Sequence, residues 1–132
     1  MKLKAPLKNK GEKLKEPPTS KTEPQYLTIS LRYIRYSHCI SGCDDSETRS
    51  FADKVRILTG KLWTEINGMP RHGLGFEQIS RNSLQVAVPE HLTDDVNIIA
   101  FRFSGLKPMI GYRDGPVFYV LWFDRAFDCY RH

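Results

Sequence analysis

The sequence of 132 residues has few cysteines and no long hydrophobic run. No apolar stretch approaches the roughly 20 residues that a membrane-spanning helix needs, which excludes an integral helical membrane protein. The three cysteines, Cys39, Cys43 and Cys129, are an odd number, which favours reduced thiols over a framework of disulfides. Lysine and proline interrupt the N-terminal region throughout, so it lacks the hydrophobic core of a secretory signal. We therefore expect a cytoplasmic protein with no membrane partner.

Aromatic residues are absent from residues 1–24, and half of the eight prolines of the chain lie there. This region holds seven lysines and three glutamates, so it carries most of the net charge of +5. A segment of this composition has little to bury, which predicts a flexible tail before a single domain over residues 25–132. The domain holds 13 basic and 12 acidic residues, and ten of the basic residues are arginine, which suits bidentate phosphate contacts.

Two apolar runs near the end of the chain, Ile98–Phe103 and Val117–Phe123, have the length and composition of β-strands. Large apolar residues alternate along the first run, which predicts a strand with one buried face. The second run has no charged residue, which predicts an interior strand covered on both faces. Asp114 and Gly115 lie between the runs and form a strong signal for a hairpin turn.

The earlier part of the domain shows one long strand candidate, two helix candidates and two short strand candidates. These are, in order, Gln25–Tyr36, Ser46–Leu58, Lys61–Asn67, Phe76–Ser80 and Leu84–Val88. Helices grouped before a run of antiparallel strands are typical of an α+β domain. We expect an antiparallel sheet of four to five strands with one or two helices packed on one face.

A small group of possible metal ligands, His38, Cys39 and Cys43, lies in a turn-rich loop. Structural zinc sites usually have four ligands in paired, recognisable spacings, and this loop offers three. Cys129 or His72 would complete the set only if the tertiary fold brought them close. We therefore assign no metal ligand and no cofactor, and keep a small metal-binding regulatory domain as the third functional reading.

The end of the chain combines arginine on a hairpin, the hydrophobic run VFYVLWFD and a polar end with Tyr130 and His132. In this pattern it resembles the RelE/ParE-like toxins of bacterial toxin–antitoxin systems, whose arginine-bearing strand precedes a hydrophobic central strand and a terminal Tyr or His-Tyr. The resemblance covers the topology of about residues 25–132 and the residue pattern of the last third. It implies a small endoribonuclease that acts on RNA, often on the ribosome, and a cognate antitoxin as a protein partner.

The resemblance also implies metal-independent acid–base chemistry. A base withdraws the proton of the ribose 2′-OH, a cation stabilises the charge on the phosphorane, and an acid protonates the 5′-oxygen. Glu77 resembles the family's carboxylate, Arg113 or Arg102 resembles its phosphate-binding arginine, and Tyr130 and His132 resemble its terminal pair. We expect Arg113, Tyr130 and His132 to converge on one concave face, with Glu77 and Arg102 flanking it. Further residues expected to bind nucleic acid are Arg71, His72, Arg81 and Lys107.

Arg102 and Arg113 are alternatives for the phosphate-binding role. Arg113 is next to the predicted hairpin turn, whereas Tyr130 follows the other end of Val117–Phe123. A strand of that length spans roughly 23 Å. Arg113 therefore meets Tyr130 only if the tail turns back across the sheet, and otherwise Arg102 is the better partner.

The chain departs from the family pattern in three respects, one of which is the small net positive charge of its domain. Its terminal order is Tyr-Arg-His, and no lysine cluster follows the first helix, where ribosome-dependent members often have one. Dependence on the ribosome therefore stays open. The alternative reading is a non-catalytic accessory module, of a phage or mobile element, that contacts nucleic acid or a host protein through its sheet and its lysine-rich tail.

Overall fold

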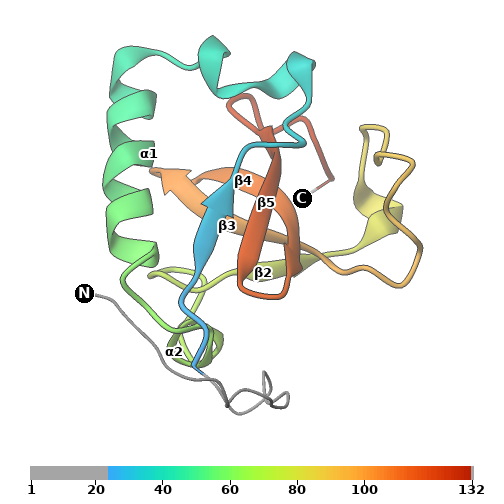
Figure 1. Cartoon of the computed structure of the whole chain (residues 1–132). Coiled ribbons are helices and arrows are strands. Elements are labelled where there is room, and N and C mark those ends of the chain that lie inside the picture. Colours follow the sequence, from blue (N-terminus) through green and yellow to red (C-terminus); the bar gives the residue numbers. More distant parts are fainter. Residues whose placement is uncertain (1–23, 132) are drawn as a thin grey trace, which may run out of the picture.

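The computed structural model describes residues 24–131, which form a five-stranded sheet and two α-helices (Figure 1). The elements are β1 (Thr28–Ser30), α1 (Asp45–Leu58), α2 (Trp63–Asn67), β2 (Glu77–Ile79), β3 (Ile98–Ser104), β4 (Lys107–Asp114) and β5 (Val117–Phe123). Short 3₁₀ helices lie at Tyr36–His38, Ile40–Gly42 and Arg81–Ser83. Neither α-helix of this part of the chain has the length and apolar character needed to cross a membrane. The tail expected over residues 1–24 lies outside the described residues, except for its last residue.

The strands lie in the order β1-β5-β4-β3-β2. The last four strands along the chain pair antiparallel, whereas β1 runs parallel to β5. The predicted α+β domain is confirmed, with a sheet that is mixed rather than wholly antiparallel. Both helices and three strands separate β1 from β5 in the sequence, so no hairpin turn determines the direction of that pairing.

Hydrophobic side chains cover both faces of the sheet. On the first face α1 and α2 pack on strand residues, in a cluster that includes Leu58, Trp63 and Phe101. The second face carries a cluster that includes Trp122 and Tyr130, and the segment after β2 and the C-terminal tail cover it. Because β5 contributes buried residues to both clusters and lies between β1 and β4, the prediction of an interior strand covered on both faces is confirmed.

Two strand predictions are shorter or absent in the structure. Within Gln25–Tyr36 only Thr28–Ser30 pairs in the sheet, because a turn follows and the chain then enters a 3₁₀ helix. Leu84–Val88 is not a strand, and Leu84 forms an isolated antiparallel bridge with Tyr130. Its alternating apolar residues pack on the second face of the sheet without joining it.

The carboxylate of Glu47 connects α1 to two distant segments. Asp44 accepts a hydrogen bond from the Glu47 amide, and Glu47 accepts one from the Asp44 amide, both at 2.8 Å, which makes a capping box. Lys107 Nζ on β4 lies 2.7 Å from Glu47 Oε2, and Arg125 Nε in the tail lies 2.5 Å from Oε1. Glu47 is only 2% exposed, so its carboxylate is shielded from water, whereas the side chains of Lys107 and Arg125 are 33% and 43% exposed.

We expect the stability contributed by Glu47 to be lost in acid. Lys107, the Asp44 amide and Arg125 together lower the pKa of Glu47 to about 2, from an ordinary value of 4.5. A lowered folded-state pKa stabilises the fold above the ordinary value, and the contribution is lost as the pH falls from 4.5 towards 2. Glu47→Gln should cost about 1–3 kcal/mol at neutral pH.

The measurement is urea unfolding of both proteins between pH 7 and pH 2.5. The stability of Glu47→Gln should fall less steeply below pH 4.5 than that of the wild type. Asp53→Asn, which changes an exposed carboxylate on the same helix, serves as the control and should follow the wild type. Parallel pH profiles for Glu47→Gln and the wild type would contradict this role of Glu47.

Gly111 allows a close approach of β4 to β5. The register shifts at this position, and a Cβ atom added to Gly111 would lie 1.8 Å from the carbonyl oxygen of Tyr119. We expect Gly111→Ala to lower the free energy of unfolding by about 1–3 kcal/mol in urea titrations, because backbone atoms have to move. Gly42→Ala has no atom within 4 Å of the added Cβ and should change it by less than about 0.5 kcal/mol. Equal free energies of unfolding for Gly111→Ala and Gly42→Ala would contradict this close pairing of β4 and β5.

Candidate functional site

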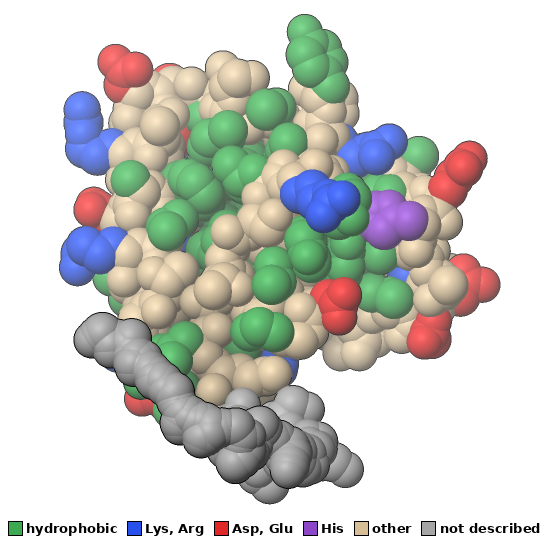
Figure 2. Space-filling model, in the orientation of Figure 1, with side chains coloured by type: hydrophobic (Ala, Val, Ile, Leu, Met, Phe, Trp, Pro, Cys, Tyr) green, Lys and Arg blue, Asp and Glu red, His purple; other side chains and the backbone are tan. Residues whose placement is uncertain are grey.

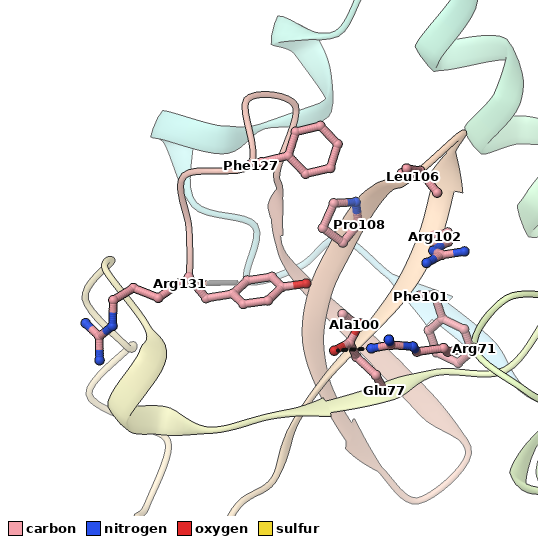
Figure 3. Close-up of a pocket in the computed structure, with 10 residues that line it drawn as sticks. Arg71, Glu77, Ala100, Phe101, Arg102, Leu106, Pro108, Phe127 and Arg131 are labelled. Atoms are coloured by element: carbon pink, nitrogen blue, oxygen red, sulfur yellow. Dashed lines mark ion pairs between the residues drawn. The ribbon is translucent and has the colours of Figure 1, made fainter.

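A cavity of about 400 Å³ lies between the sheet and the C-terminal tail. Five polar or charged residues line it: Arg71 from the loop after α2, Glu77 from β2, Arg102 from β3, and Tyr130 and Arg131 from the tail. The side chain of Arg131 points away from the other four and donates to the carbonyl of Asn82. Leu106, Pro108 and Phe127 add apolar surface around them (Figure 3). A carboxylate, two guanidinium groups and a phenol therefore share one concave surface.

Strand register places Glu77 and Arg102 on the same side of the sheet. Glu77 pairs with Ala100 in the antiparallel ladder between β2 and β3. Arg102 lies two residues beyond Ala100, so the side chains of both residues project from one face. Diagonal neighbours in such a ladder lie about 7–8 Å apart, which long side chains can span.

Arg71 reaches the cavity from a tight loop. The amides of Gly73 and Gly75 both donate to the carbonyl of Pro70 at 3.0 Å. A Cβ atom at Gly75 would lie 2.0 Å from the carbonyl oxygen of Met69, so the loop requires glycine there. Arg71 Nη1 lies 3.0 Å from Glu77 Oε2, as the dashed line in Figure 3 shows.

Backbone hydrogen bonds fix the tail that carries Tyr130. The Gln85 amide donates to the Cys129 carbonyl at 2.7 Å, and the Arg131 amide donates to the Ser83 carbonyl at 2.8 Å. These bonds lie on both sides of Tyr130, whose side chain is buried with only 8% of the residue exposed. The phenol is therefore held in one place against the sheet.

The electrostatic surroundings of Tyr130 keep its phenol protonated. Burial is the largest cause that raises its pKa, followed by the negative charge of Glu77. The positive charges of Arg71 and Arg102 oppose this rise. At neutral pH the group is thus a proton donor, and it lies within electrostatic reach of both arginines.

Arg113 lies elsewhere in the structure. Its guanidinium stacks over Trp63, 4.2 Å from the ring centre, and Nη2 donates to Gln25 Oε1 at 3.0 Å. It lies five positions after Pro108, which lines the cavity, a distance of roughly 17 Å along a strand. The structure therefore brings Arg102, not Arg113, to Tyr130. His132 lies outside the described residues.

Of the four residues expected to bind nucleic acid, two lie at or beside the cavity and two lie elsewhere. Arg71 lines the cavity, and His72 is exposed beside it on the same loop. Arg81 Nη2 donates to the carbonyls of Thr93 and Val96 at 2.6 and 2.8 Å, so it supports the segment before β3. Lys107 contacts Glu47, as described above. These last two cations stabilise the fold and lie outside the cavity lining.

Lys54 on α1 is a cation near the site that the sequence patterns did not single out. Burial and the positive charge of Arg102 lower its pKa, so the two cations lie near each other. Lys54 follows Phe51 by three residues and precedes Leu58 by four, which places a lysine on the apolar stripe of the helix. A charged residue within such a stripe is a signal that could have identified it.

On the face seen in Figure 2, hydrophobic side chains gather in the middle, and charged groups of both signs are scattered among them and along the margin. This face has no continuous basic surface, in keeping with the 13 basic and 12 acidic residues of the domain.

Comparisons with models of known protein families, with curated proteins and with solved structures give no match for this chain. Function therefore has to be inferred from the cavity and its side chains.

We expect Arg113→Ala to act on stability. Loss of the stacking on Trp63 and of the hydrogen bond to Gln25 should lower the free energy of unfolding by about 1–2 kcal/mol. Urea titration measures this, with Arg49→Ala, an exposed arginine of α1, as the control. A cost no larger than that of Arg49→Ala would contradict a structural role for Arg113.

Proposed function

We propose that the protein is an endoribonuclease and that the cavity between the sheet and the tail is its active site. The observation that carries this proposal is the convergence of Glu77, Arg71, Arg102 and Tyr130 from four separate segments. These groups provide a base, two cations and an acid, the set that RNA cleavage by attack of the 2′-oxygen requires. The resemblance to RelE/ParE-like toxins supports the same chemistry.

In the proposed reaction, the carboxylate of Glu77 accepts the proton of the ribose 2′-OH. The 2′-oxygen attacks the adjacent phosphorus, and a bond forms between them. The bond from phosphorus to the 5′-oxygen breaks, and Tyr130 gives its proton to that leaving oxygen. The products are a 2′,3′-cyclic phosphate and a 5′-hydroxyl, and proton exchange with water returns Glu77 and Tyr130 to their initial states.

Arg102 is placed to stabilise the charge that develops on the phosphorane. It is on the cavity face of β3, and its guanidinium makes no hydrogen bond or ion pair with another of the described residues. Arg71 orients the Glu77 carboxylate through the ion pair at 3.0 Å. Lys54 adds positive charge near Arg102, which favours an anionic substrate at this end of the sheet.

Apolar residues at the cavity suit the bases of single-stranded RNA. Phe127 is 42% exposed and Leu106 is 66% exposed, and both line the cavity. Bases stack on exposed aromatic side chains with little dependence on sequence. The proposed partner is therefore single-stranded RNA in the cytoplasm, whether free or on the ribosome, and the family resemblance adds a cognate antitoxin.

The experiment is cleavage of a labelled single-stranded RNA by the wild type and by three variants, Glu77→Gln, Arg102→Ala and Tyr130→Phe. Each variant should lose activity by about 100-fold or more, because each removes a group that acts in the transition state. Arg113→Ala is the matched control, since it removes an arginine that lies away from the cavity, and it should keep its activity. Circular dichroism should show that all variants remain folded.

Two results would overturn the proposal. One is wild-type activity in all three cavity variants. The other is a wild-type protein that binds the RNA and leaves it intact, which would favour the non-catalytic binding module. Analysis of the products adds an independent check, because a 3′-phosphate formed without a cyclic intermediate would contradict attack by the 2′-oxygen.

A further inference from the structure

A second group of chemically reactive side chains lies where the tail meets the segment after β1. His38 comes from the 3₁₀ helix Tyr36–His38, and Asp128 and Cys129 come from the tail. One ligating atom of each residue lies within 4.8 Å of the others. His38 Nε2 is 3.2 Å from Asp128 Oδ1. Residues separated by about 90 positions in the sequence are thus brought together.

We propose that His38, Asp128 and Cys129 bind a zinc ion. An imidazole nitrogen, a carboxylate oxygen and a thiolate sulfur are all ligands that zinc accepts, whereas magnesium and calcium prefer oxygen alone. Zinc lies about 2.0–2.2 Å from nitrogen and oxygen ligands, so two ligands of a tetrahedral site lie about 3.3–3.5 Å apart. The observed 3.2 Å between His38 and Asp128 is close to that separation.

The neighbouring groups orient the ligands. Ser37 Oγ lies 2.8 Å from His38 Nδ1, which leaves Nε2 of the same ring for the metal. The fully buried carboxylate of Asp124 accepts hydrogen bonds from the amides of Asp128 and Cys129, at 2.8 and 3.2 Å. Asp124 therefore fixes the backbone of both tail ligands and adds negative charge beside the proposed cation.

The site is open on one side. A cavity of about 540 Å³ is lined by His38, Asp128 and Cys39, among others, whereas Cys129 is fully buried and is not part of the lining. An ion can therefore enter from solvent, and water can occupy a fourth position, as in zinc sites with three protein ligands. Cys39 and Cys43, expected from the sequence to accompany His38, do not belong to the cluster.

Zinc at this position would connect the segment after β1 to the tail. Cys129 is adjacent to Tyr130, so the ion would also restrain the residue that lines the other cavity. This inference depends on the ligand geometry alone and does not require RNA cleavage. Its test therefore uses binding and stability, so that it can fail or succeed separately from the proposed function.

In the experiment, the full chain is treated with a chelator and then titrated with zinc chloride alone. Isothermal calorimetry measures the binding. Binding of one equivalent is expected, with a rise in melting temperature of about 5 °C or more at saturation. Cobalt(II) as a probe should give a thiolate charge-transfer band. His38→Ala and Asp128→Asn should each weaken zinc binding by at least about 10-fold, and Cys129→Ser should also remove the cobalt band.

Cys43→Ser is the matched control, because it removes a thiol of the same region that lies outside the cluster, and its binding should equal that of the wild type. Asp128 is exposed, so Asp128→Asn tests the site even if Cys129→Ser does not fold. Absence of zinc binding in the wild type would overturn the proposal. So would loss of binding in Cys39→Ser with unchanged binding in Asp128→Asn, which would assign the metal to the loop thiols.

Discussion

The buried carboxylate of Glu47 is the interaction on which the arrangement of the domain depends. It completes the cap of α1 and, through Lys107 and Arg125, joins the helix to β4 and to the start of the tail. A buried carboxylate with one partner missing is costly, which favours the single arrangement in which both cations reach it. The tail therefore leaves β5 in a defined direction, and Tyr130 depends on that direction for its place.

The tail then lies against the second face of the sheet. Its amides and carbonyls pair with the segment after β2, where the sequence pattern indicated a strand at Leu84–Val88. This pairing closes one side of the proposed active site, and β2 and β3 form another. An irregular segment thus does what a helix would do in a simpler two-layer domain, since it covers apolar residues and at the same time leaves a cavity beside them.

Local patterns in the sequence predicted the elements better than their partners. Alternation along Ile98–Phe103 and the Asp114-Gly115 turn are short-range signals, and each corresponds to an observed element. The parallel pairing of β1 and the cluster of His38 with Cys129 depend on contacts between residues about 90 positions apart. No period or spacing in a single sequence encodes such contacts, because they arise only when the whole sheet assembles.

Arg102 and Arg113 show which part of the candidate site short-range sequence patterns can predict. Period-two alternation places Arg102 on the opposite face of β3 from Phe101, and the location of Phe101 in the cluster beneath the helices then assigns Arg102 to the face that the tail covers. Arg113 stacks on Trp63, a residue of α2, and so lies on the helical side and near the opposite end of β4. The sequence alone could show that Arg113 meets Tyr130 only if the tail turns back across the sheet. Which face the tail covers is decided by the pairing of Glu47 with Arg125 and by the bonds to residues 83–85, and these place Arg102 at the proposed active site.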